Sequence, residues 1–368
     1  MQSLAAIFNV GLLALGLIML SQGSEYFVET ASKLARSAGI SELFIGLTLV
    51  AVGTSLPEIV SSSLAVVAGS AYLAFGNVLG SYIANLTLVI GLSAVLAPLA
   101  SNAALLGRDS KVMIFILLFL GFSMFDPVTP AQIVAYEGVV LLLLFVAYVL
   151  FLYDNRDECE TCYQFEVFVD YLIRLRFLTT LQGLARKSHA TKSKVVDSNH
   201  EEEHDESAQQ KQLVRPYRDS MIVILSCLGV VVGAQFVIQG ATHLSLFWGV
   251  NEGLIGLTVV ALGTSLPEIM VSVNSARKGF GRLLIGNVIG SNIINITLGL
   301  GIGVLAVSVS IDMLTAGLLM GLSLAISTLF YFVIKVDWRV TRREGVLLIL
   351  CYVFAQIAVF SILQLGGV

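Results

Sequence analysis

Apolar residues are grouped along the chain in blocks of about 20, and short polar stretches separate the blocks. A helix of that length crosses the hydrocarbon core of a bilayer, where each backbone group must find its partner within its own segment. The pattern therefore predicts an all-α membrane protein, integral and multi-pass. Its ten expected transmembrane helices lie near residues 4–24, 42–67, 72–98, 112–125, 132–152, 219–241, 253–275, 283–307, 311–334 and 345–365.

The composition also supports a location in the membrane. Hydrophobic residues make up 57% of the 368-residue chain and charged residues 12%, against about 25% charged in ordinary soluble domains. If the loops alternate between two sides, all 21 Lys and Arg fall on one side, in loops that include the long polar stretch 153–218. Because basic loops stay in the cytoplasm, we expect that stretch to be cytoplasmic and both termini to be extracytoplasmic.

The chain also contains an internal repeat. Residues 46–58 read GLTLVAVGTSLPE and residues 256–268 read GLTVVALGTSLPE, while residues 76–88 read GNVLGSYIANLTL and residues 286–298 read GNVIGSNIINITL. Both pairs are offset by 210 residues, and an odd number of predicted spans, five, separates the copies. The second copy therefore enters the membrane from the opposite side, and we expect two inverted five-helix repeats, an architecture of many secondary transporters.

These features divide the chain into an N-terminal half (1–152), a cytoplasmic loop (153–218) and a C-terminal half (219–368). In the loop, residues 163–185 carry apolar side chains at helical spacing, which predicts an amphipathic helix. It either lies on the inner membrane surface or packs on the bundle as a soluble helix. Residues 186–215 are polar and are expected to be disordered. Their run 200–206, rich in Glu and His, is interpreted as a solvated acidic tract, with a regulatory metal site as the alternative.

Each copy of the Gly-Thr-Ser-Leu-Pro-Glu motif is expected to break its helix. Proline lacks an N–H, and its ring clashes with the carbonyl four residues earlier, which here belongs to a glycine. Carbonyls released by such a break are tolerated at membrane depth only where they face a cavity or an ion. The helix-breaking residues are Gly53 and Pro57 in the first copy and Gly263 and Pro267 in the second.

The motif also brings two carboxylates, Glu58 and Glu268, into the membrane. A charge at the bilayer centre costs at least about 2.5–3.5 kcal/mol, so these residues indicate a functional site. The alternative is a protonated, hydrogen-bonded glutamate in the core. Two glutamates balance one divalent cation, and neighbouring carbonyl and hydroxyl oxygens complete a ligand set typical of calcium or sodium. Further neutral oxygens at i and i+4 belong to Ser81 and Asn85, and to Ser291 and Asn295.

The paired GTSLPE motifs and the GNVxGS segments that follow them resemble the alpha repeats of the calcium/cation antiporter superfamily, specifically its sodium/calcium exchanger family. The resemblance covers all the predicted spans and implies that Glu58 and Glu268 ligate calcium and share the sodium sites. Asn295 stands where well-known relatives often have aspartate, so we expect two carboxylates in the site rather than three. The other implied ligands are the backbone carbonyls of Thr54, Thr264, Ala51 and Ala261, the side chains of Ser55, Ser265, Ser81 and Ser291, and the central polar residue Asn85.

The resemblance implies a secondary active antiporter that exchanges calcium for sodium by alternating access, with the first and sixth helices as sliding gates. The main alternative is a calcium/proton or potassium-coupled antiporter of the same fold, and the third is a cation channel. An enzyme is not expected, because the spans hold no nucleophile–base pair and no histidine-rich metal set. The expected partners are calcium, sodium and the lipid bilayer, with no cofactor and no nucleic acid.

Overall fold

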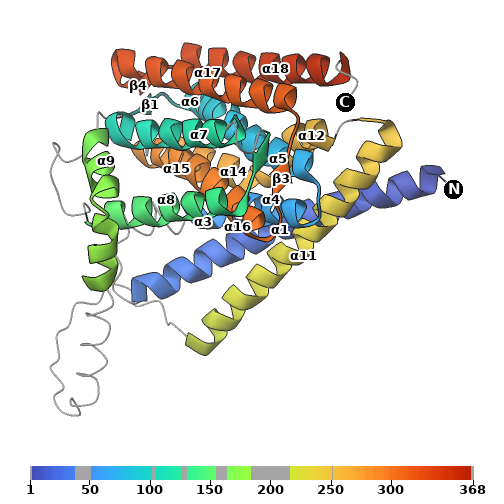
Figure 1. Cartoon of the computed structure of the whole chain (residues 1–368), viewed down its shortest axis with the longest axis horizontal. Coiled ribbons are helices and arrows are strands. Elements are labelled where there is room, and N and C mark those ends of the chain that lie inside the picture. Colours follow the sequence, from blue (N-terminus) through green and yellow to red (C-terminus); the bar gives the residue numbers. More distant parts are fainter. Residues whose placement is uncertain are drawn as a thin grey trace.

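The computed structural model describes residues 2–37, 51–101, 105–125, 131–154, 164–183, 216–250, 252–277, 279 and 281–365. The segment 186–215 that is expected to be disordered, its acidic run 200–206, and residues 46–50 of the first motif copy lie outside these ranges. Within them the chain folds into a bundle of helices with two very short strand pairs (Figure 1).

Seven of the described helices are long and apolar enough to cross a membrane: Ile7–Phe27, Ala71–Leu96, Ala135–Asp154, Tyr217–Trp248, Leu284–Ala306, Met313–Asp337 and Arg342–Ser361. Gly256–Thr264 and α14 (Leu266–Arg277) qualify as an eighth only together, because a bend of 49° separates them. The predicted helical architecture is confirmed. The predicted number of ten spans is not established by the described residues, since α7 (Ser110–Met124) and α4 (Leu56–Val67) have only 15 and 12 residues.

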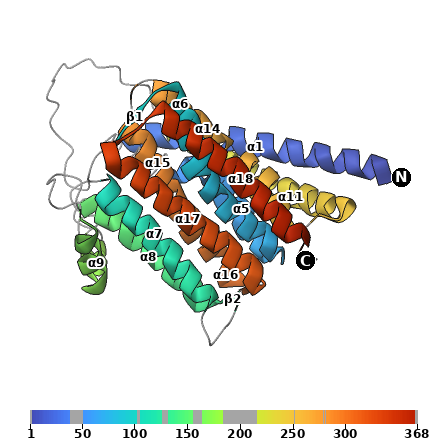
Figure 2. The same ribbon diagram turned by 90° about the horizontal axis from the view of Figure 1, so that it is seen from above.

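Helices α1 (Gln2–Ser37) and α11 (Pro216–Trp248) extend beyond the first and sixth spans predicted from the sequence. They cross each other in opposite directions beside the rest of the bundle (Figure 1, Figure 2). A Cβ atom added to Gly16 would lie 2.7 Å from the carbonyl oxygen of Gly233, and one added to Gly233 would lie 2.9 Å from that of Gly16. The two helices therefore pack backbone against backbone, which only glycine permits.

The backbone follows the sequence repeat element by element. In the first half, α5 (Ala71–Ala84) continues into the π-helical turn η2 (Asn85–Val89) and then α6 (Ile90–Leu96). The second half repeats the order, with its π-helical turn beginning 210 residues later, in α15 (Gly281–Ile294), η5 (Asn295–Leu300) and α16 (Gly301–Ala306). Such turns are frequent at functional sites. The hydrophobic pattern did not predict them, because it specifies only helix.

Two antiparallel strand pairs, absent from the predicted all-α fold, connect the halves. Strand β1 (Leu99–Ala100) pairs with β4 (Arg339–Val340), and β2 (Gln132–Ile133) pairs with β3 (Val309–Ser310). Each pair takes one strand from each half, and the two pairs lie at opposite ends of the bundle (Figure 1, Figure 2). The two halves are therefore joined at both ends.

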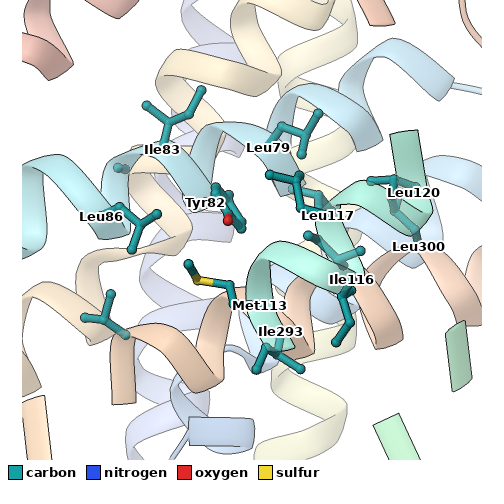
Figure 3. Close-up of a cluster of buried hydrophobic side chains, with 14 of the residues drawn as sticks. Leu79, Tyr82, Ile83, Leu86, Met113, Ile116, Leu117, Leu120, Ile293 and Leu300 are labelled. Carbon is teal, nitrogen blue, oxygen red and sulfur yellow. The ribbon is translucent and has the colours of Figure 1, made fainter. Parts of the chain in front are cut away.

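The hydrophobic core lies where α5, α7 and α15 meet (Figure 3). Leu79 and Tyr82 of α5, Met113 of α7 and Ile293 of α15 are fully buried there. This cluster therefore combines residues from both halves of the chain.

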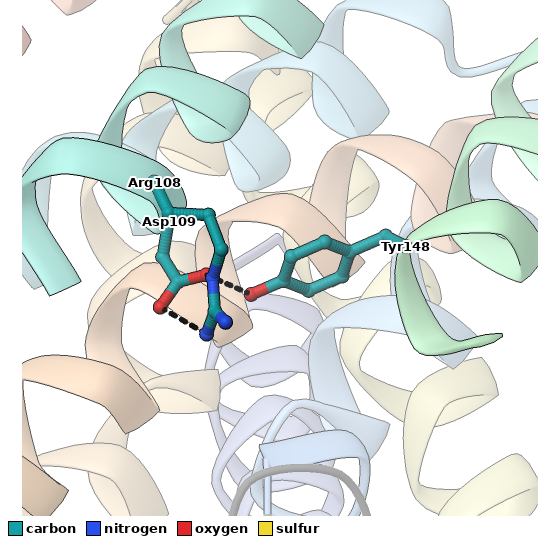
Figure 4. A network of polar contacts seen from close by, with 3 residues as sticks. All are labelled: Arg108, Asp109 and Tyr148. Carbon is teal, nitrogen blue, oxygen red and sulfur yellow. Dashed lines mark hydrogen bonds and ion pairs between the residues drawn. The ribbon is translucent and has the colours of Figure 1, made fainter. Parts of the chain in front are cut away.

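A buried ion pair lies at the start of α7 (Figure 4). In the π-helical turn η3 (Leu105–Asp109), Arg108 donates from Nε to Asp109 Oδ1 (2.6 Å) and from Nη2 to Oδ2 (3.0 Å). The hydroxyl of Tyr148 also donates to Asp109 Oδ1 (3.3 Å). All three side chains are buried, and the bidentate geometry offsets part of the cost of removing the charges from water.

The amphipathic helix predicted in the central loop is shorter than expected. Helix α9 (Phe165–Ile173) runs across the ends of the bundle helices (Figure 1), and a turn separates it from a second helical stretch at 176–183. Phe168 is buried, and its ring makes a T-shaped contact with that of Phe151 in α8 (Ala135–Asp154), at 5.4 Å between centroids. This face of α9 therefore packs on the bundle.

Candidate ion-binding site

The first motif interrupts its helix at Ser55. Helix α3 (Ala51–Thr54) ends directly before this residue, and α4 begins directly after it with Pro57 in its first turn. Because Pro57 has no N–H, it cannot bond the carbonyl of Gly53 as a residue of a continuous helix would. The interruption places the motif's serine and glutamate at the start of a new helix.

The second motif is interrupted at the matching residue, Ser265, where the chain bends by 49°. Pro267 again lies in the first turn of the following helix. Gly263 faces the side chain of Leu17 in α1, and an added Cβ atom would lie 2.5 Å from Leu17 Cδ2, so that Leu17 would have to move. The first helix of the chain therefore packs directly on the second motif.

The two motifs meet through reciprocal hydrogen bonds. The hydroxyl of Ser55 donates to Glu268 Oε1 (3.1 Å), and the hydroxyl of Ser265 donates to Glu58 Oε1 (2.8 Å). Both glutamates are 0% exposed. Each serine thus bonds the glutamate of the opposite half, and this arrangement brings the two predicted carboxylates into one site.

Ser81 of α5 adds a third hydroxyl to the site. Its Oγ lies 3.4 Å from Glu58 Oε1, 3.1 Å from Ser265 Oγ and 3.4 Å from the carbonyl oxygen of Ala261. Its counterpart Ser291 is buried but has no hydrogen-bond partner among the described residues. The two serines are equivalent in sequence and differ in their contacts.

The remaining carboxylate oxygens, Glu58 Oε2 and Glu268 Oε2, are buried and lack a hydrogen-bond partner in the described part of the chain. No basic side chain in that part forms an ion pair with either carboxylate. Two buried carboxylates are costly unless protons or a cation balance them. Carboxylate and hydroxyl oxygens gathered in one place are the ligands that hard cations prefer, so the geometry suits cation binding.

The predicted carbonyl ligands lie next to the helix breaks. The carbonyl of Ala51 accepts the amide of Ser55 (3.1 Å), and that of Ala261 accepts the amide of Ser265 (3.0 Å). The hydroxyl of Thr54 turns back to the carbonyl of Ala51 (3.3 Å). A carbonyl oxygen has two lone pairs, and each of these two carbonyls already accepts at least one hydroxyl besides the amide. An ion at either carbonyl would therefore take the place of a hydroxyl donor.

A polar cluster lies beside the site and links the two halves. The amide of Asn77 donates to the hydroxyls of Ser61 (2.9 Å) and Ser62 (2.7 Å), and its Oδ1 accepts from Thr264 (3.2 Å). The sequence analysis missed both serines. Their spacing was a usable signal, since they follow Glu58 by three and four residues on the same helix face.

The two central asparagines differ in their surroundings. Asn85 donates from Nδ2 to Oδ1 of Asn292 (3.0 Å), whereas Asn295 is buried and neither of its amide atoms has a partner among the described residues. Asn292 was also missed. It directly follows Ser291 and so lies about 100° around the helix from the face that the i, i+4 spacing selects.

Comparison with known proteins identifies the family. The family model described as sodium/calcium exchanger protein matches residues 8–153 and 220–361, which include both motif copies and most of both halves. The chain belongs to this family. It is an integral, multi-pass helical membrane protein of the exchanger class, as the sequence resemblance predicted.

Several relatives are similar to this chain over nearly their whole length. The chain is 35% identical over 355 residues to the sodium/calcium exchanger MaX1 of Methanosarcina acetivorans, covering 96% of this chain and 99% of the relative. It is 30% identical over 340 residues to the inner membrane protein YrbG of Escherichia coli, covering 91% and 90%. Among solved structures it resembles the sodium-calcium exchanger NCX_Mj soaked with Na⁺ and Sr²⁺, with a TM-score of 0.57, 30% identity, and 96% and 98% coverage.

Proposed function

We propose that this exchanger is a secondary active antiporter that moves calcium against sodium by alternating access, with the ions bound between Glu58 and Glu268. The observation that carries the proposal is the reciprocal pairing of the motifs, in which Ser55 and Ser265 each bond the glutamate of the other half. MaX1 and NCX_Mj are both described as sodium/calcium exchangers, which supports the choice of ions.

The ligand set supports a shared site for the two cargo ions. The two carboxylates carry the charge that balances one calcium, and a few sodium ions fit the same oxygen-rich surroundings. We assign ligand roles to both glutamates, to the carbonyls of Ala51, Ala261, Thr54 and Thr264, and to the side chains of Ser55, Ser265, Ser81, Ser291, Asn85 and Asn295. The helices are interrupted beside the ion site by the helix-breaking residues Gly53, Pro57, Gly263 and Pro267.

Coupling follows from sharing these ligands. An empty site would leave two carboxylates unbalanced in a low-dielectric interior, which is costly. The empty carrier therefore crosses poorly between its outward-open and inward-open states, and only loaded forms switch. Influx of one ion is thereby tied to efflux of the other.

We also infer ten spans, with the halves at 1–152 and 219–368. The η3 turn and α7 together cover residues 105–124, long enough for a fourth span, and the sequence predicts the second at 42–67. Contacts between segments that the charge sorting places on one side support this topology: Lys33 pairs with Asp219 (3.0 Å), and β1 pairs with β4. The loop 153–218 is then cytoplasmic and both termini are extracytoplasmic.

Helices α1 and α11 are the proposed sliding gates. The backbones of α1 and α11 are in contact at Gly16 and Gly233, which supports movement of the two helices as one unit. Leu17 of α1 also contacts Gly263, so this unit touches the second motif directly. A shift of α1 along its axis would therefore change the access of solvent to the ion site.

Calcium uptake into proteoliposomes under separate sodium, potassium and proton gradients tests the proposal. We expect calcium to accumulate when sodium is trapped inside, and no uptake without a counter-ion. Uptake driven only by potassium or protons contradicts the sodium coupling. Uptake that needs no counter-ion indicates a channel and contradicts exchange altogether.

A further inference from the structure

A chain of buried amides crosses between the halves next to the proposed site. Asn292 of α15 donates from Nδ2 to the backbone carbonyl of Tyr82 (3.3 Å), and its Oδ1 accepts from Nδ2 of Asn85 (3.0 Å). Asn292 Nδ2 also lies 3.7 Å from the sulfur of Met113. All four residues are fully buried, so no bulk water competes for these bonds.

The chemistry of the carbonyl decides the direction of this chain. A backbone carbonyl only accepts hydrogen bonds, so Asn292 must turn its NH₂ toward Tyr82 and its oxygen toward Asn85. Asn85 must then turn its own NH₂ toward Asn292, and its oxygen points the other way. That oxygen, Asn85 Oδ1, is buried and has no hydrogen-bond partner within the described residues.

The residue with the free oxygen lies one helical turn from a side chain that contacts Glu58. Asn85 follows Ser81 by one helical turn, on the same face, and Ser81 Oγ is 3.4 Å from Glu58 Oε1. We propose that Asn292 is a positioning residue of the ion site, which holds Asn85 with its carbonyl oxygen toward the cations. The proposal rests on the proposed function, because it takes Asn85 to be a ligand.

Only one half has this arrangement. The position that matches Asn292 holds Tyr82, whose hydroxyl bonds Ser327 (2.6 Å) in α17 (Met313–Asp337). Asn295, which matches Asn85, consequently has no second asparagine to orient it. Asn292 therefore orients Asn85 alone. Its effect on ion binding must disappear when the side chain at position 85 presents an oxygen in either orientation.

The test uses an aspartate at position 85, because a carboxylate has an oxygen at both ends. Asn292→Leu should raise the calcium KM of sodium-driven uptake by about 10-fold or more, because losing a group that orients a metal ligand usually has an effect of this size. The maximal rate should stay within about twofold of the wild type. In the Asn85→Asp background, adding Asn292→Leu should change the KM by less than about twofold. Thr297→Val, whose hydroxyl donates only within its own helix, is the matched control and should leave both parameters unchanged.

Two results overturn the proposal: a wild-type KM in Asn292→Leu, or an equally large rise in the Asn85→Asp background. Asn292→Ser, which is too short to bridge Tyr82 and Asn85, should show the same rise and serves if the leucine variant does not fold. Absence of sodium-driven uptake in the wild type contradicts the proposed function itself. Normal wild-type uptake with an unaltered Asn292→Leu variant contradicts only the role of Asn292.

Discussion

Helices α5 and α15 occupy matching places in the two halves, yet their buried polar side chains differ in hydrogen bonding. On α5, Asn77 and Ser81 both bond to neighbouring side chains. Asn287 and Ser291, at the matching positions of α15, and Asn295, the first residue of η5, together present five buried polar atoms without a partner among the described residues. The polar side chains of the two halves are therefore equally buried but differ in how many of their hydrogen bonds are formed.

The difference arises at single positions of the neighbouring helix. Ser61, which accepts from Asn77, is matched in the second half by Val271, and Ser272, which matches Ser62, is itself buried without a partner in the described part of the chain. The duplication has thus preserved the backbone and the carboxylates while the surrounding polar network diverged. Asn77 and Ser81 of α5 bond to neighbouring helices, whereas Asn287 and Ser291 of α15 remain able to bond water or ions.

The largest effect is expected where the halves are alike, at the carboxylates. Glu58→Gln and Glu268→Gln should each lower sodium-driven calcium uptake at least about 100-fold, because removing one partner of a buried ionic contact costs about 3–5 kcal/mol. Uptake of radioactive calcium into proteoliposomes measures both. Unequal losses would show that the site belongs mainly to one half.

The matched control for these variants is Glu344→Gln. Glu344 accepts from the backbone N–H of Thr341 (2.7 Å) at the start of α18 (Arg342–Leu365), outside the site. Its uptake should stay within about twofold of the wild type, since a cap contributes only about 1 kcal/mol of stability.

The next effect concerns an ion pair that only the first half has. Arg108 and Asp109 are matched in the second half by Leu318 and Leu319. Asp109→Asn should lower the free energy of unfolding by about 3–5 kcal/mol, because it removes the charge facing a buried guanidinium. Replacing Arg108 and Asp109 together by leucine should cost much less, since apolar residues of similar size often replace buried ion pairs without loss.

Unfolding of the purified protein in detergent, followed by intrinsic fluorescence, compares these variants. A leucine pair as unstable as Asp109→Asn would mean that the first half needs the charges themselves. The second half would then be stabilised in a different way at the same positions.

The smallest predicted effect tests the comparison of α5 with α15 directly. Asn77→Leu should lower the free energy of unfolding by about 1–3 kcal/mol, because it removes the partner of buried hydroxyls, Ser62 above all. Asn287→Leu should leave stability unchanged or raise it, since no bond to a described residue is lost. The same unfolding measurement applies, and equal destabilisation by the two variants would contradict the difference between the helices.

Much of the architecture could be predicted from the sequence, because duplication leaves a visible offset. The offset of 210 residues between the motif copies is repeated in the positions of η2 and η5. The apolar blocks predicted the long helices correctly. They could not predict the strand pairs β1–β4 and β2–β3, because a two-residue strand has no periodicity and its partner lies in the other half.

The candidate site was only partly accessible to such reasoning. Helical spacing placed Ser81 and Asn85 on one face, but it could not show that Ser55 bonds Glu268, since this contact depends on how the halves pack. Asn292 lies off the selected face, so its bond to Asn85 emerged only in three dimensions. The ion pair Arg108–Asp109 appeared in the sequence simply as loop charge.

Calcium titration by calorimetry in sodium-free buffer tests most directly whether the two motifs form one shared site. The reciprocal contacts of Ser55 and Ser265 predict one calcium per chain in the wild type and none in either Glu58→Gln or Glu268→Gln at concentrations that saturate the wild type. Two calcium ions per wild-type chain, with one remaining in each variant, would contradict a shared site and indicate two independent ones.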